Sequence, residues 1–182
     1  MDTHQGVSGT YTIRRCTLGY MGLNAIGRGL LTLEDSTLYG RNLVNFRSDY
    51  GSTWEGDLVI KNCRWIPGNG ATMTPTMIGV SNDGKHDFGY PCFMPRHITI
   101  NNLIVEDRHV PDDYADMYFF SNHDNKSPDS ERPFPYHLTQ SISVQGVETA
   151  SGKIPRISPH PAVQKSVVIK NNESAYFTSL KW

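Results

Sequence analysis

Six segments of the chain share one pattern of apolar and polar residues that is eight positions long. Apolar residues occupy positions one and three, polar residues occupy positions four and five, and position six is small or apolar in the first five segments. The alternation at positions one to three is typical of a β-strand with one buried face. The segments span residues 11–18, 31–38, 58–65, 98–105, 142–149 and 167–174.

The polar pair at positions four and five is predicted to bend the chain between two strands. Asn and Asp suit such a bend, because they tolerate the left-handed backbone region and their side chains bond the local backbone. Four segments carry one of them at position five, namely Asp35, Asn62, Asn102 and Asn171. The last three residues of each segment are then expected to start the next strand.

Successive segments begin 20, 27, 40, 44 and 25 residues apart. One bare turn of a solenoid takes roughly 20 or more residues, so the larger spacings indicate inserted loops. A repeat this short buries its apolar face only by stacking on its neighbours. We therefore predict parallel strands, joined by right-handed crossovers, with one continuous interior row. That row is Ile13, Leu33, Ile60, Ile100, Val144 and Ile169.

A further strand is expected upstream of each segment. The candidates are short apolar stretches at 4–7, 23–26, 43–46, 77–80 and 117–120. The loops that join these strands to the main pattern lengthen along the chain and cover residues 47–57, 81–97 and 121–141. Because equivalent positions of successive parallel strands lie side by side, we expect the three loops to form one lobe that walls a groove.

This repeat resembles that of the right-handed parallel β-helix proteins of the pectin-lyase-like superfamily, over most of the chain. The glycine-rich and aspartate motifs of polygalacturonases are missing, as is the arginine and calcium-site spacing of pectate lyases, so the repeat indicates no subfamily. The resemblance implies an all-β solenoid of about six coils with long loops on one edge. We expect one domain over residues 1–182, with preceding coils or an oligomeric partner covering its N-terminal end, because an uncapped solenoid end exposes strand edges.

Composition narrows the class of partner. Hydrophobic residues make up 37% of the chain and the formal net charge is -1, which indicates a globular protein with no preference for nucleic acid or an anionic membrane. No apolar run is long enough to span a bilayer, and no signal peptide is visible. Cys16 and Cys63 recur at position six, so both are predicted to be buried, unpaired thiols; the third cysteine is Cys92.

The first long loop combines aromatic rings with charged groups. Tyr50 and Trp54 could cover the apolar face of a sugar ring, while Arg47, Asp49 and Glu55 bond its hydroxyls or a uronate. The competing interpretation is that Trp54 packs over the edge of the coil and that Arg47 pairs with Asp49.

The next two loops each carry a His–Asp pair, His86–Asp87 and His123–Asp124. If the loops converge, a carboxylate that orients an imidazole makes a general base. Solvated turn residues are the alternative interpretation. His4 and Asn45 are further substrate-binding candidates, in a polar row along the upstream strands. No cofactor is expected, and neither loop has the ligand spacing of a zinc site or a calcium-binding EF-hand.

Two classes of function fit these residues. The first is an enzyme that hydrolyses or eliminates a polysaccharide, with Arg47, Asp49, His86, His123 and Asp124 as the catalytic candidates. The second is a non-catalytic module, such as a phage tailspike segment, an adhesin or a carbohydrate-binding part of a larger protein. Both take a polysaccharide as partner, and both imply a secreted, cell-surface or virion location.

Overall fold

The computed structural model describes residues 9–19, 23–46, 54–67, 75–79, 93–110, 118–120, 137–153, 156 and 168–171. Within these ranges every regular element is a β-strand, and every strand pairing is parallel. The described part of the chain is therefore all-β, as the alternating pattern predicts.

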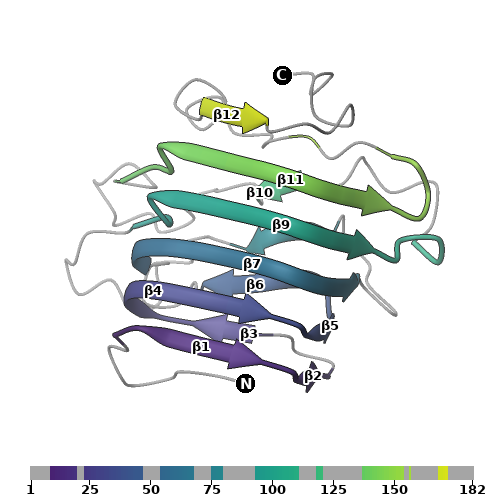
Figure 1. The fold of residues 1–182 in the computed structure, drawn as a ribbon, viewed down its shortest axis with the longest axis horizontal. Coiled ribbons are helices and arrows are strands. Elements are labelled where there is room, and N and C mark those ends of the chain that lie inside the picture. Colours follow the sequence, from purple (N-terminus) through teal and green to yellow (C-terminus); the bar gives the residue numbers. More distant parts are fainter. Residues whose placement is uncertain are drawn as a thin grey trace, which may run out of the picture.

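The larger of two sheets has eight strands. Six of them follow one another in the order β1 (Tyr11–Arg14), β4 (Gly27–Glu34), β7 (Trp54–Ile66), β9 (His97–Val105), β11 (Ser141–Thr149) and β12 (Val168–Asn171). The short strands β2 (Thr17–Leu18) and β5 (Thr37–Tyr39) continue β1 and β4 beyond a bend, and β5 also pairs with β7. Figure 1 shows the long strands stacked in chain order.

The smaller sheet has four strands in the order β10 (Tyr118–Phe120), β8 (Thr76–Gly79), β6 (Asn42–Phe46) and β3 (Leu23–Ala25). Each of these four strands overlaps a stretch that the sequence predicts as an upstream strand, so those four predictions are confirmed. The fifth predicted stretch, 4–7, lies outside the described residues. Up to β11 the chain alternates between the sheets, and each strand returns beside its predecessor in the same sheet.

The register of the repeat is as predicted for the first five segments. Tyr11 pairs with Leu31, Leu31 with Leu58, Leu58 with Ile98, and Ile98 with Ile142. Side chains alternate between the two faces of a strand. A register shift by an odd number of residues would therefore have turned the buried side chains to the opposite face.

The last segment departs from the predicted register by two residues. Ile169 pairs with Ile142 rather than with Val144, and Asn171 pairs with Val144 instead of standing at the bend. A shift of two residues leaves the strand faces unchanged, so the alternating pattern alone does not distinguish the two registers.

One hydrophobic core joins the two sheets. The interior row of the larger sheet is buried at Ile13, Leu33, Ile60, Ile100 and Val144, and the smaller sheet adds residues such as Phe46 and Met77 to the same cluster. Stacking therefore buries an apolar row that no single repeat could bury alone.

The two cysteines at position six differ. Cys63 is buried, as predicted, whereas Cys16 is exposed, and both are free thiols. The prediction for Cys16 is wrong because the strands around it, β1 and β2, have a partner on one side only within the described structure. The repeat alignment itself holds, since the backbone amide of Thr37 donates to the carbonyl of Cys16 at 2.9 Å.

Candidate functional site

The bend between the two halves of the long strands carries a row of polar side chains. Position five adopts a left-handed backbone in five successive repeats, with φ of 53° at Arg15, 50° at Asp35, 51° at Asn62, 59° at Asn102 and 63° at Gly146. The turn assignment of Asp35, Asn62 and Asn102 is thereby confirmed. Backbone hydrogen bonds cross the bend, such as Asp35 N to Lys61 O at 3.0 Å, so the strands stay stacked through it.

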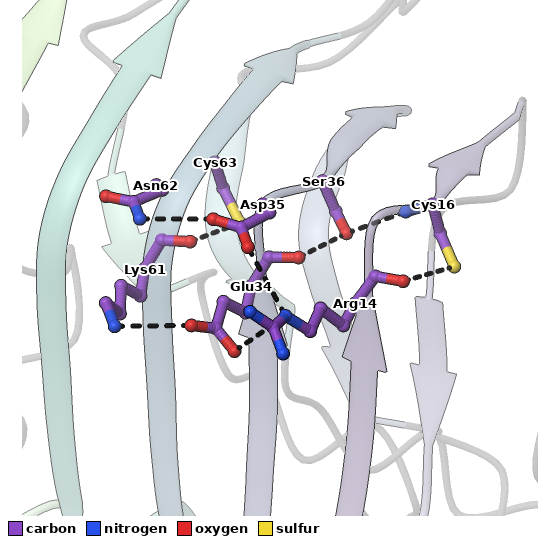
Figure 2. A network of polar contacts seen from close by, with 8 residues as sticks. All are labelled: Arg14, Cys16, Glu34, Asp35, Ser36, Lys61, Asn62 and Cys63. Atoms are coloured by element: carbon purple, nitrogen blue, oxygen red, sulfur yellow. Dashed lines mark hydrogen bonds and ion pairs between the residues drawn. The ribbon is translucent and has the colours of Figure 1, made fainter.

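The side chains at position five form a ladder that runs across the strands. Nδ2 of Asn102 donates to Oδ1 of Asn62 at 3.1 Å, and Nδ2 of Asn62 donates to Oδ1 of Asp35 at 3.1 Å. Figure 2 shows the second of these bonds next to the ion pairs of position four. Each amide thus satisfies the next, which orients the polar groups along a line.

Position four supplies the charged neighbours of this ladder. Nε of Arg14 lies 3.4 Å from both Oε2 of Glu34 and Oδ2 of Asp35, and Nζ of Lys61 lies 3.2 Å from Oε1 of Glu34 (Figure 2). The Asn62 amide, followed by Arg14, holds the pKa of the Asp35 carboxyl below its usual value. Asp35 is therefore an ionised acceptor at neutral pH and is unsuited to act as a general acid.

Position six closes the inner side of the bend. Oγ of Ser36 donates to the carbonyl of Glu34 at 2.7 Å and accepts from the amide of Cys16 at 3.1 Å. The thiol of Cys63 donates to the carbonyl of Lys61 at 3.3 Å, and burial raises its pKa. A protonated, buried thiol is a poor nucleophile, so Cys63 serves the packing of the bend.

An open groove of about 350 Å³ lies on this bend and crosses β5, β7 and β9. Amide, carboxylate, hydroxyl, thiol and guanidinium groups line it, with the apolar side chain of Ile104. The lining residues are Asp35, Ser36, Thr37, Asn62, Cys63, Arg64, Asn102 and Ile104. On its rim Arg64 forms an ion pair with Glu106.

The sequence marks position five as a turn, but it does not mark the bend as a binding surface. The signal that could have revealed it is the recurrence of amide and carboxylate side chains at one repeat position. In a parallel stack such residues must lie side by side.

Trp54 differs from its expected position in a loop. The strand β7 begins at Trp54, four residues before the repeat, and the Trp54 ring is 1% exposed. The ring stacks on Phe46 with centroids 5.9 Å apart, and its Nε1 donates to the carbonyls of Gly29 and Asp57, each at 3.2 Å. The structure thus places Trp54 in the core, with no open ring face for a sugar.

Glu55 and Asn45 are the other candidates within the described structure. Glu55 is exposed on β7 beside Arg28. Asn45 is half-buried on β6, where it is the register partner of Asn24 and Gly79. Neither residue lines the groove on the bend.

The remaining candidates lie outside the described residues, as does the packing of the three loop tips. They are His4, Arg47, Asp49, Tyr50, His86, Asp87, His123 and Asp124. The C-terminal ends of the last two loops are described and lie side by side, because Phe93 and His137 pair in parallel and their rings stack 4.3 Å apart.

Within the described ranges, no group of three or more His, Cys, Asp or Glu side chains could hold a metal ion. The same part of the chain contains no helix that could cross a membrane. No family model, curated protein or solved structure matches this chain.

Proposed function

We propose that this chain is a right-handed parallel β-helix of about six coils, of the pectin-lyase-like kind, and that it binds a polysaccharide along the groove on its bend. The observation that carries the proposal is the groove itself, in which polar groups of equivalent type repeat from strand to strand. Neighbouring parallel strands lie about 4.8 Å apart, so a linear polymer laid across them meets similar groups at each step.

The chemistry of the lining fits sugar hydroxyls. Asn62 and Asn102 offer amides, Asp35 accepts hydrogen bonds as a carboxylate, and Arg64 donates them from the guanidinium of a side chain that is 48% exposed. Carboxylate and guanidinium groups make stronger hydrogen bonds than neutral groups, which favours specific recognition of a hydroxyl pair. Ile104 adds an apolar contact for the face of a sugar ring.

The groove favours binding over cleavage of the glycosidic bond. Such hydrolysis uses two carboxyl groups, one of them protonated by a raised pKa. Asp35 is the one carboxylate among the described lining residues, and its pKa is lowered. The groove therefore supports the non-catalytic alternative, a carbohydrate-binding module. The enzymatic alternative depends on Arg47, Asp49, His86, His123 and Asp124, in or beside the long loops.

The test is retention on a panel of neutral and acidic polysaccharides, followed by titration of a bound glycan. Arg64→Ala should weaken binding about tenfold, the value expected for one charged hydrogen bond. Because exposed ion pairs contribute little to stability, its melting temperature should stay close to that of the wild type.

Arg14→Ala is the matched control. Arg14 is also an exposed, ion-paired arginine, with 53% of its side chain accessible, but it does not line the groove. Its substitution should leave the affinity unchanged. A wild-type chain that binds no glycan in the panel, or an equal loss of affinity in both variants, would contradict the proposal.

A further inference from the structure

An aspartate, a histidine and a serine stand at the same place in three successive repeats, namely Asp57, His97 and Ser141. Each directly precedes the first apolar residue of its repeat. Ser141 on β11 is the register partner of His97 on β9. Asp57 precedes Leu58 on β7 as His97 precedes Ile98 on β9, and Leu58 pairs with Ile98, so Asp57 and His97 each stand one residue before the same register pair. The residues that follow each of the three are buried, which places this row on the outer face of the sheet.

The serine and the histidine are in contact. Nδ1 of His97 lies 2.9 Å from Oγ of Ser141, within hydrogen-bond distance. His97 is exposed and Ser141 is half-buried, so a ligand on the outer face reaches both. When Nδ1 accepts a hydrogen bond from the serine hydroxyl, the neutral ring carries its own proton on the other nitrogen, Nε2.

Asp57 is the neighbouring acidic group. Among the described residues nothing donates a hydrogen bond to its Oδ1, although that oxygen is buried. A buried carboxylate oxygen without a donor is costly, and such exceptions call for an explanation. A serine, a histidine and a carboxylate in line are the groups of a nucleophilic hydrolase, in which the carboxylate orients the imidazole.

We propose that Ser141, His97 and Asp57 form an esterase site that removes O-acyl groups from a polysaccharide. Oγ of Ser141 attacks the ester carbonyl while Nδ1 of His97 takes its proton. The ester C–O bond then breaks, and the imidazolium returns that proton to the departing sugar oxygen. Water attacks the acyl-serine in the same way, releasing a carboxylic acid and restoring the serine hydroxyl.

Asp57 is a positioning residue in this scheme. By accepting a hydrogen bond from the N–H group at Nε2 after a side-chain rotation, it fixes the tautomer in which Nδ1 is the base and stabilises the imidazolium.

The chemical class of the substrate follows from the setting. A serine–histidine pair transfers acyl groups and does not cleave glycosidic bonds, which require carboxylates. Among the described residues, the row lies on the outer face of a sheet, which suits an acyl group carried on an extended polymer. Esters also have a better leaving group than amides and need less stabilisation from an open site. The choice of a polysaccharide as carrier rests on the proposed function, whereas the ester chemistry does not.

The full chain should be tested with two probes that carry no sugar. Wild type should hydrolyse p-nitrophenyl acetate, and a fluorophosphonate should label it at Ser141, as located by peptide mass analysis. Ser141→Ala should abolish labelling and reduce hydrolysis at least about a hundredfold, while leaving the imidazole in place. His97→Gln should lose a similar factor.

Ser143→Ala is the matched control, because Ser143 lies on the same strand face two residues away and pairs with Thr99 instead of a histidine. It should behave as wild type in both assays. Asp57→Asn should lower kcat with KM and melting temperature unchanged, a separation that a merely structural role would not produce.

The proposal is overturned if wild type is neither labelled nor faster than the unfolded chain, if labelling falls on another serine, or if Ser141→Ala retains full activity. Since neither probe resembles a glycan, these outcomes are independent of whether the groove on the bend binds a polysaccharide.

Discussion

The single residues at position five set the direction in which the chain continues after each strand. Asn and Asp adopt the left-handed region more readily than other residues with a side chain, and glycine adopts it freely. Four of the five described bends follow this rule, and Arg15 is the exception. The sequence predicts this part of the fold well because a local backbone preference and a local side chain determine it together.

Gly146 ends the ladder of side chains, since it stands next to Asn102 without one. A Cβ atom at Gly146 would lie 3.6 Å from the nearest atoms, so there is room for a side chain. We expect Gly146→Asn to donate its amide to Oδ1 of Asn102 and to raise the free energy of unfolding by roughly 0.5–1 kcal/mol, the net value of one hydrogen bond. Chemical denaturation measures this difference.

Gly146→Ala separates the amide from the loss of the glycine. Alanine fits the same space but has no amide and tolerates the left-handed region poorly, so it should lower the free energy of unfolding by about 1 kcal/mol. Equal stabilisation by alanine and asparagine would show that the ladder contributes nothing.

Asp35 should make the fold sensitive to acid. Its pKa in the folded state lies below the unfolded value near 3.8, so its contribution to stability is complete above that value and is lost as the pH falls through the folded pKa. Asp35→Asn should therefore show a smaller drop in melting temperature than wild type between pH 5 and pH 3, a range that brackets the unfolded value. A drop as steep as that of wild type would contradict this assignment.

The strands depend on close backbone contact where glycines pair. Gly29 on β4 and Gly56 on β7 are register partners, and a Cβ atom on Gly56 would lie 1.8 Å from the carbonyl oxygen of Gly29. Backbone atoms of a paired strand cannot move aside without breaking the sheet. We expect Gly56→Ala to lower the free energy of unfolding by about 3 kcal/mol or more.

Gly19→Ala provides the comparison for that experiment, because no atom lies within 4 Å of a Cβ built at Gly19. It should change the unfolding midpoint little. If Gly56→Ala and Gly19→Ala have the same free energy of unfolding, the result would contradict the close backbone contact between β4 and β7.

The sequence pattern predicts which segments form strands better than it predicts where each strand begins and ends. The apolar alternation predicts β1, β4, β7, β9 and β11 in their correct register. The sequence prediction missed that β7 starts at Trp54, although Trp54 and Gly56 continue the alternation of buried positions. Glycine has no apolar side chain to mark the alternation, and long-range bonds such as Arg96 N to Gly56 O at 2.7 Å hold this part of the strand.

At the scale of the whole molecule, the stack creates surfaces that no segment has alone. Asp57, His97 and Ser141 are up to 84 residues apart in sequence, yet Ser141 pairs with His97, and Asp57 and His97 stand one residue before the pair Leu58–Ile98. The loop candidates were selected for their residue types, whereas this row and the groove on the bend arise from repeat positions. An alignment of the polar residues by their position in the repeat would have predicted both the row and the groove.

The central claim is that a polysaccharide lies along the groove on the bend, and backbone-amide chemical shifts measured by NMR test it most directly. Titration with a glycan that the chain retains should shift the amides of residues 35–37, 62–64 and 102–104 together, at one common dissociation constant. Saturable shifts confined to other residues would contradict the claim.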